Sequence, residues 1–329
     1  MMRNSFAKKI TELSSVNDQI ALLAGDIGNR LFDDFKYQNP KKFFNCGVAE
    51  QNMIGVSAGL AQQGFLPFVY TIAPFCTSRC FEQIRVDVCY HNVPVTIVAV
   101  GAGLSYANLG PTHHSFEDIA ILRTLPNMRI LCPADPDEVD ACLELAVADP
   151  KPTYIRLGKK GEPRIHERSI DRDELASRIP LRKGKEICLL STGALLKETL
   201  ECSKILSQYG YDASVYSVPQ VKPFPSKIIE EIFTEYQTIA VFEEHSIIGG
   251  FSAAVAEWTI DNQLDTTKLL RFGINDEFHI KSGSQSYARQ ALGLCPQAFA
   301  NQILKVISGP EHENTCSNFS SNQKSISTG

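Results

Sequence analysis

The sequence predicts an α/β fold of two consecutive domains, each with a mostly parallel sheet flanked by helices. Short apolar runs alternate with longer helical segments in two separate series, which is typical of parallel β-α units. The chain has 329 residues, more than one typical domain of about 100 to 200 residues contains. A charged segment without apolar periodicity separates the two series.

The first series defines a domain over residues 1–157. Its expected strands are apolar runs at residues 20–24, 67–72, 93–100 and 129–132. Its expected helices lie at residues 53–63, 79–90, 115–125 and 136–148. The last helix has Pro136 in its first turn, where proline is favoured because no helical N–H partner is lost.

The second series defines a domain over residues 186–308. Its expected strands lie at residues 187–191, 214–218, 238–242 and 269–273, and its expected helices at 194–209, 226–236, 250–262 and 296–307. Half of the residues between the domains, 158–185, are charged, which predicts a surface linker. Residues 309–329 are rich in Ser, Asn and Thr and predict a disordered tail.

Composition excludes several classes of protein. The formal charge of -5 disfavours a broad basic surface for nucleic acid or an anionic membrane. No apolar run reaches the roughly 18 residues of a membrane span, and the first 15 residues lack the apolar stretch of a signal peptide. The ten cysteines are scattered without a C-x-x-C pair or zinc-type spacing. We therefore expect a cytoplasmic protein with reduced thiols and no nucleic-acid or membrane partner.

Polar residues after the first strand form one candidate site, because ligands of parallel sheets collect beyond the carboxyl ends of strands. The turn Gly25-Asp26-Ile27-Gly28-Asn29-Arg30 offers flexible backbone, one carboxylate and one guanidinium. A polar turn in which Asp26 caps a helix is the alternative interpretation.

Glu50 is the second candidate, as the one carboxylate at the start of an otherwise apolar, glycine-rich helix. A helix N-terminus favours a carboxylate, so first-turn capping is an alternative explanation. In a buried helix, the carboxyl group would instead exchange a proton with a ligand nitrogen.

The loop after the strand at 93–100 carries two further signals. Gly101-Ala102-Gly103-Leu104-Ser105-Tyr106 imitates a dinucleotide fingerprint, but Tyr106 replaces the third glycine, so a nucleotide- or flavin-binding module is only an alternative. His113 and His114 follow Pro111 just before an expected helix. Adjacent side chains on extended backbone point in opposite directions, so one imidazole is expected to face a pocket while the other packs or meets solvent. Two surface histidines are the alternative.

These segments together resemble the transketolase family of thiamine diphosphate enzymes from about residue 15 to 307. Glu50 in Gly-Val-Ala-Glu-Gln-Asn-Met matches the invariant glutamate of that family's pyrimidine-binding domain. Gly110-Pro111-Thr112-His113 matches its substrate-channel motif. Glu243-Glu244-His245 followed by Gly249-Gly250 resembles its carboxy-terminal domain. The resemblance implies that the first domain is the pyrimidine-binding domain and the second the transketolase carboxy-terminal domain.

The resemblance implies a thiamine diphosphate site on the first domain. The Glu50 carboxyl would hydrogen-bond the ring nitrogen of the aminopyrimidine and act as a catalytic group. Phe75 would pack on the face of that ring, although aromatic residues in such loops more often belong to the core. Asp26 and Arg79 are the other expected cofactor-binding residues.

The resemblance also implies a substrate site for small sugars. His113 would exchange protons with sugar hydroxyls and act as a catalytic residue. His114, Arg30 and Lys159 are the other expected substrate-binding residues. Lys159 or Lys160 falls near the family's phosphate-binding arginine, and surface lysines are the alternative interpretation. Leu109 stands where an acidic residue is usual, and the phosphate-contacting histidine expected near Gly101 is missing.

One family motif is absent from the sequence. The Gly-Asp-Gly followed some 25 to 30 residues later by Asn, which binds Mg²⁺ and the diphosphate, is approached only by Gly25-Asp26. We therefore expect no metal ligand on this chain, and expect Mg²⁺ to be held by a separate amino-terminal transketolase subunit that carries the motif. The resemblance thus implies the carboxy-terminal subunit of a split transketolase, in an assembly of two copies of each chain.

Two other thiamine diphosphate classes remain as alternatives. The β subunit of a 2-oxoacid dehydrogenase complex has the same two-domain plan and also lacks the magnesium motif. An enzyme like 1-deoxyxylulose-5-phosphate synthase is the other. Gly110-Pro111-Thr112-His113 with Leu122-Arg123 favours a transketolase that transfers a two-carbon ketol unit between sugars or sugar phosphates.

Overall fold

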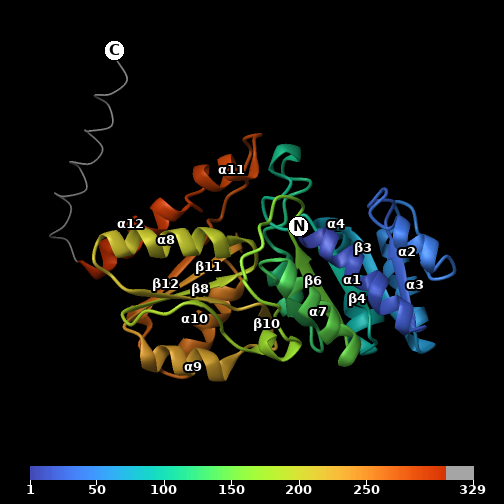
Figure 1. Cartoon of the computed structure of the whole chain (residues 1–329), viewed down its shortest axis with the longest axis horizontal. Coiled ribbons are helices and arrows are strands. Elements are labelled where there is room, and N and C mark those ends of the chain that lie inside the picture. The colour runs from blue at the N-terminus through green and yellow to red at the C-terminus, as the bar shows by residue number, and fades with distance from the viewer. Residues whose placement is uncertain (309–329) are drawn as a thin grey trace, which may run out of the picture.

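The computed structural model describes residues 1–308, and these form two α/β domains that lie side by side (Figure 1). Each domain has a mostly parallel sheet flanked by helices, which confirms the predicted fold class. The tail expected over residues 309–329 lies outside the described residues.

The first domain is built on a seven-stranded sheet in the order β10-β5-β6-β4-β3-β1-β2. All of its strands are parallel except β10, which pairs antiparallel with β5. The strands are β1 (Ile20–Ala24), β2 (Phe43–Asn45), β3 (Leu66–Ile72), β4 (Thr96–Val100), β5 (Arg129–Leu131), β6 (Thr153–Leu157) and β10 (Gln220–Lys222). The helices are α1 (Met2–Val16), α2 (Asp33–Gln38), α3 (Glu50–Gln62), α4 (Ala73–Cys76), α5 (Phe81–Gln83), α6 (Asp118–Arg123) and α7 (Pro136–Ala148).

The second domain has a five-stranded sheet in the order β12-β11-β8-β9-β7, parallel except for β7. Its strands are β7 (Ile179–Arg182), β8 (Ile187–Thr192), β9 (Ala213–Ser217), β11 (Thr238–Ser246) and β12 (Leu269–Ile274). Its helices are α8 (Leu196–Gln208), α9 (Ser226–Glu235), α10 (Phe251–Asp261), α11 (Gln285–Ala291) and α12 (Pro296–Ile307).

Several elements differ from the expected ones for local reasons. The strand expected at 93–100 begins at Thr96, because Pro94 has no N–H to donate to a neighbouring strand. The helix expected over 79–90 is irregular, with a 3₁₀ turn at Ser78–Cys80, one turn of α-helix and a π-helix at Ile84–Tyr90. The apolar pattern predicts none of the helices α1, α2, α4 and α11, and none of the strands β2, β6, β7 and β10.

The segment expected as a linker, residues 158–185, is packed onto the domains. His166 is buried, and its Nε2 lies 2.7 Å from Glu138 Oε1 of α7. Strand β7, within the same segment, pairs with β9 and so belongs to the second sheet. Some charges of the segment also pair with folded elements, among them Arg164 with Asp137 of α7 and Arg178 with Glu235 of α9.

Two features join the domains. Strand β10 belongs in sequence to the second domain but lies at the edge of the first sheet. One hydrophobic cluster also contains side chains from both domains, among them Ile130 and Val241. The relative position of the two domains is thus fixed by packing as well as by the chain.

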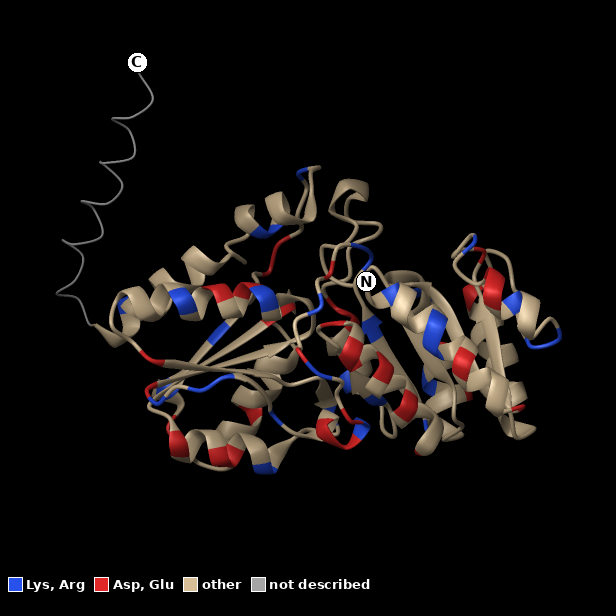
Figure 2. Ribbon diagram, in the orientation of Figure 1, with Lys and Arg blue, Asp and Glu red and all other residues tan. Residues whose placement is uncertain are grey.

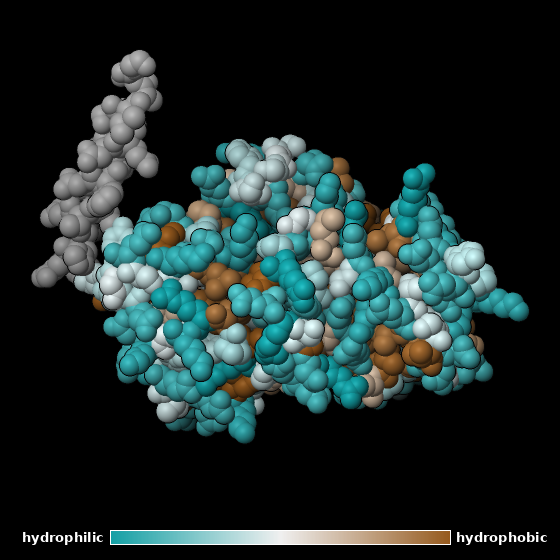
Figure 3. All heavy atoms as spheres, in the orientation of Figure 1, coloured by the Kyte–Doolittle hydropathy of each residue, from teal (hydrophilic) through white to brown (hydrophobic). Residues whose placement is uncertain are grey.

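Charged residues of both signs are interspersed over both domains (Figure 2). On the face shown in Figure 3, hydrophobic side chains lie in separate groups among hydrophilic ones. No helix within residues 1–308 is long and apolar enough to cross a membrane.

Candidate active site

The predicted site residues gather at one edge of the first sheet. Parallel strands β1, β2, β3 and β4 end at this edge, and the loops that follow them carry Asp26, Glu50, Phe75 and His113. The carboxyl ends of parallel strands are where ligands of open α/β sheets bind.

Glu50 is the first residue of α3 and is only 3% exposed. Its Oε2 accepts a hydrogen bond from Arg79 Nη1 at 2.8 Å, and the structure records no partner for Oε1. The Arg79 side chain is 42% exposed, so solvent screens this ion pair. The buried Glu50 side chain therefore has one carboxyl oxygen without a recorded partner, while Arg79 holds the other.

Phe75 connects Glu50 with the histidine loop. The Arg79 guanidinium lies 4.2 Å from the centroid of the Phe75 ring, a cation-π contact. The His113 ring meets the same phenyl ring edge-on, with centroids 5.2 Å apart. Glu50, Arg79, Phe75 and His113 thus form one continuous group of contacts, drawn from the start of α3, the short helical turns after β3 and the loop after β4.

His113 is partly exposed beside two groups that tune its chemistry. Its Nδ1 lies 2.9 Å from Thr112 Oγ1. Burial lowers the pKa of His113, and the charge of Lys159 lowers it further. The neutral imidazole, which can accept a proton, is therefore favoured over a wider pH range.

Three basic residues, Arg3, Lys159 and Lys160, lie close together near His113. The Lys159 ammonium sits 4.1 Å from the centroid of the Tyr106 ring, which in turn lies 5.8 Å from His113. Burial, and then the charges of Arg3 and Lys160, lower the pKa of Lys159. The sequence alone does not identify Arg3, because it lies in α1, which the apolar pattern does not predict. It indicates Tyr106 only as the residue that replaces the third glycine of a dinucleotide fingerprint.

The remaining predicted residues are placed less directly. Asp26 and Arg30 are exposed in the turn after β1, both with positive φ, and Asn45 Nδ2 donates to Asp26 Oδ1 at 3.0 Å. His114 is 4% exposed and stacks on Phe116, with His279 of the second domain nearby. The structure records no contact between these residues and Glu50 or Phe75.

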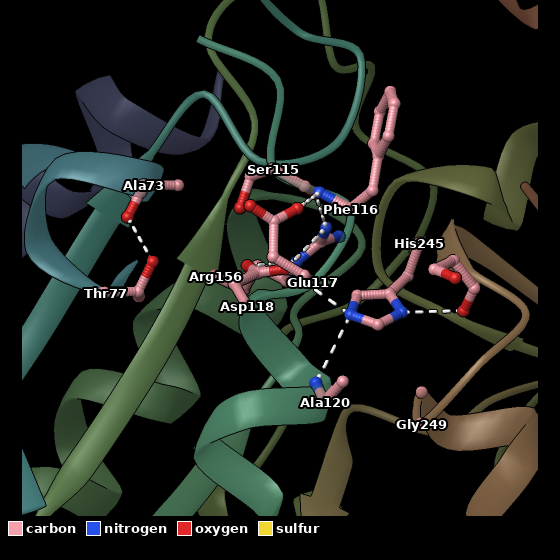
Figure 4. A network of polar contacts seen from close by, with 12 residues as sticks. Ala73, Thr77, Ser115, Phe116, Glu117, Asp118, Ala120, Arg156, His245 and Gly249 are labelled. Atoms are coloured by element: carbon pink, nitrogen blue, oxygen red, sulfur yellow. Dashed lines mark hydrogen bonds and ion pairs between the residues drawn. The ribbon is translucent and has the colours of Figure 1, made fainter. Parts of the chain in front are cut away.

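A buried polar network supports the histidine loop from below (Figure 4). Arg156 Nε donates to Asp118 Oδ2 at 2.7 Å, and Tyr154 Oη donates to the same oxygen at 2.5 Å. Burial alone would raise the pKa of Asp118, but the charges of Arg156 and His245 and the hydrogen bonds of Arg156 and Tyr154 outweigh it, so the pKa is lowered. Asp118 therefore stays ionised as the counter-charge of Arg156.

A cleft of about 740 Å³ lies elsewhere, between the domains. Arg123, Lys222 and Trp258 help to line it, and none of the predicted site residues does. Arg123 is already engaged by the Gly249 and Gly250 carbonyls and by Glu257. The contacts of Glu50, Arg79, Phe75 and His113 lie outside this cleft.

The residues around Glu50 suit one half of thiamine diphosphate. A carboxyl oxygen without a recorded partner, near a partly exposed phenyl ring, fits a flat nitrogen heterocycle. Within residues 1–308, no group of three or more His, Cys, Asp or Glu side chains lies close enough together to hold a metal ion. The residues around Glu50 thus fit the pyrimidine.

Comparison with known proteins matches both domains. Residues 1–163 match the family model of the transketolase pyrimidine binding domain, and residues 178–298 match that of the transketolase C-terminal domain. A putative transketolase C-terminal section from Methanocaldococcus jannaschii is 33% identical over 92% of this chain and 95% of its own length. One of the subunits of an apulose-4-phosphate transketolase from Phocaeicola vulgatus is 32% identical over 90% of this chain and 96% of its own length.

One solved structure is similar over nearly the whole chain. It is described as a split-gene transketolase in an inactive β4 tetramer. Its TM-score is 0.83 at 31% identity, with 93% of this chain and 98% of that chain covered.

Proposed function

The chain belongs to the transketolase family, and we propose that it is the carboxy-terminal subunit of a split transketolase. In this proposal it transfers a two-carbon ketol unit between sugars or sugar phosphates, with the active site completed by a separate amino-terminal subunit. The observation that carries the proposal is the buried Glu50 carboxyl, grouped with Arg79, Phe75 and His113 at the edge of the first sheet.

The proposed cofactor is thiamine diphosphate, which when bound supplies an electron sink for cleavage of a carbon-carbon bond. Glu50 would hold a proton at the pyrimidine ring nitrogen through its free Oε1. Phe75 would lie against the pyrimidine, while Arg79 keeps the other Glu50 oxygen in place and Asp26 contributes from the turn after β1. The partner subunit would supply the Gly-Asp-Gly…Asn motif, Mg²⁺ and the diphosphate contacts.

The proposed substrate site faces His113. Its neutral ring would accept a proton from a sugar hydroxyl and return it as the carbon-carbon bond breaks or forms. Lys159, near His113, would favour an anionic substrate, and the name of the Phocaeicola vulgatus relative, which refers to a sugar phosphate, supports that class. Arg30 and His114 are the other proposed substrate residues, His114 acting from its buried position.

The proposal is tested by measuring thiamine diphosphate binding with Mg²⁺, for this chain alone and for this chain mixed with its amino-terminal subunit. We expect weak binding to the chain alone and tight binding to an assembly with two copies of each subunit, whose mass sedimentation gives. The inactive β4 tetramer of the similar structure is consistent with this division of labour. Tight binding by this chain alone would contradict the split site.

Donor choice separates the related reactions. A transketolase uses hydroxypyruvate as a two-carbon donor to an aldose acceptor, and we expect this assembly to do the same. A 1-deoxyxylulose-5-phosphate synthase or a 2-oxoacid dehydrogenase would instead consume pyruvate or another 2-oxoacid. Product analysis with hydroxypyruvate and with pyruvate decides between them, and turnover with pyruvate alone would replace the proposed activity.

A further inference from the structure

Glu244, a buried residue of the second domain, contacts the loop that carries His113. Glu244 in β11 is 1% exposed, and its Oε1 accepts a hydrogen bond from the backbone N–H of Leu104 at 2.7 Å. Leu104 belongs to the loop that follows β4 in the first domain. A bond from an N–H to an ionised carboxylate is about twice as strong as one between neutral groups.

Leu104 lies at the base of the loop that carries His113. We call the paired residues Gly103 and Ser115, where this loop begins and ends, its neck. The neck is closed by a bridge between Gly103 and Ser115, whose two N–O distances are 3.1 and 3.2 Å. The residues between them include Tyr106 and His113. Whatever fixes the neck therefore sets where the whole loop emerges from the sheet.

The loop and the Glu244 carboxylate are closely fitted. Gly103 has a φ of +60°, and a Cβ atom built on it would lie 2.4 Å from Glu244 Oε1. A side chain at Gly103 would push the carboxylate away, so glycine is required for this approach as well as for the backbone conformation.

Other side chains hold Glu244 itself. Gln285 Nε2 donates to Oε1 at 3.0 Å, and Arg289 Nε donates to Oε2. Arg156, seen in Figure 4, donates through Nη2 to Ser115 O at 2.9 Å and to Glu244 O at 3.0 Å. Both strands of the neck are thus tied to the same residue of the second domain.

We propose that Glu244 is a positioning residue that holds the loop of residues 104–114 so that His113 stays against Phe75. The inference rests on the proposed function, because it takes His113 as the proton-exchanging group. Misplacing a catalytic group by about 1 Å can cost roughly 10²-fold in rate. Glu244 would thereby link the second domain to the position of His113.

Two variants separate the effect of the length of the Glu244 side chain from the effect of its charge. Glu244→Ala removes the acceptor for Leu104 N–H. Glu244→Asp keeps a charge beside Arg289 but withdraws the carboxylate by one carbon-carbon bond, about 1.5 Å. Arg123→Met is the matched control, because Arg123 also joins the domains, through the Gly249 and Gly250 carbonyls, but does not contact the loop.

Hydrogen exchange of the full chain, without substrate or cofactor, tests the loop directly. We expect both Glu244 variants to speed exchange at amides 104–113 while amides of β4 remain protected. Arg123→Met should leave the loop amides as they are. Unchanged exchange across residues 104–113 in both Glu244 variants would overturn the proposal.

Kinetics of the assembled two-subunit enzyme test the consequence. We expect Glu244→Ala to lower kcat about 10²-fold with thiamine diphosphate affinity unchanged, and to add little to the loss in His113→Asn, because both changes act through one group. A full additional loss in the double variant would refute a positioning role. If the parent assembly shows no ketol transfer, the proposed function fails, whereas the exchange experiment still decides whether Glu244 orders the loop.

Discussion

Replacing Glu50 with Gln should abolish most of the activity while hardly changing stability. The amide keeps the size of the side chain but cannot exchange a proton with a ring nitrogen. The Arg79 partner is 42% exposed, so losing the ion pair should cost at most about 1 kcal/mol of unfolding free energy. The stacking of Arg79 on Phe75 at 4.2 Å does not involve the carboxylate and should remain.

The expected loss of rate is larger than that loss of stability. Positioned acid-base groups contribute about 10²- to 10⁴-fold, and each factor of ten corresponds to about 1.4 kcal/mol of activation free energy. Glu50→Gln should therefore raise the barrier by about 2.7 kcal/mol or more. A domain with roughly 5 to 15 kcal/mol of stability, the usual range, stays folded after losing about 1 kcal/mol.

The assay is steady-state turnover of the two-subunit assembly with hydroxypyruvate as donor, alongside urea unfolding of this chain. Glu82→Gln is the matched control, because it removes a carboxylate that pairs with Arg85 at 2.7 Å on the exposed surface. We expect that control to keep parental turnover. Turnover of Glu50→Gln within about threefold of the parent, well under the acid-base range, would remove Glu50 from the mechanism. A loss of partner assembly in sedimentation would assign its role to the interface instead.

Three further changes have expected outcomes. Lys159→Gln removes a charge that lowers the pKa of His113, so the acidic limb of the pH-rate profile should move to higher pH, whereas Lys160→Gln should leave it in place. Asp118→Asn leaves the buried Arg156 guanidinium without its counter-charge and should lower the free energy of unfolding in urea by about 3–5 kcal/mol. A loss below about 1 kcal/mol would contradict the importance of this ion pair. Burial lowers the pKa of His166 but contacts with nearby carboxylates outweigh it, so the net pKa is raised. Its stabilising contribution is therefore present at pH 5 and lost as pH rises through the folded pKa, so His166→Gln should lower Tm more at pH 5.5 than at pH 8.5, and equal losses would argue against a charged His166.

The sequence predicts the alternating elements well, because strands such as β1 and helices such as α7 combine an apolar pattern with local signals. Pro136 begins α7 where expected, and Asp135 caps it through the N–H groups of Asp137 and Glu138. The site was predictable only where residue type departs from its surroundings, as for Glu50 in an apolar helix. Its roles remain predictions until the experiments above are done.

Tertiary contacts explain what the sequence could not predict. Arg3 lies more than 150 positions from Lys159, and no local pattern indicates that their charges meet; Met2 Sδ, 3.4 Å from the Gly158 backbone N–H, brings α1 there. Glu244 is one of two adjacent glutamates on a buried strand, and only the folded chain shows which loop it holds. An apolar period of 3.6 or 2 residues indicates which face of a helix or strand is buried, but it does not indicate which residues that face contacts.

Strand β10 has a consequence for how this polypeptide can be divided. It comes late in the chain yet covers the free edge of β5, whose backbone groups would otherwise offer a template for intermolecular pairing. A fragment that stops before Gln220 would leave the edge of β5 unpaired. During synthesis, the first sheet is likewise complete only after β10 has left the ribosome. A truncation that removes β10 should therefore promote aggregation, whereas one that removes only elements after β10 leaves the edge of β5 paired.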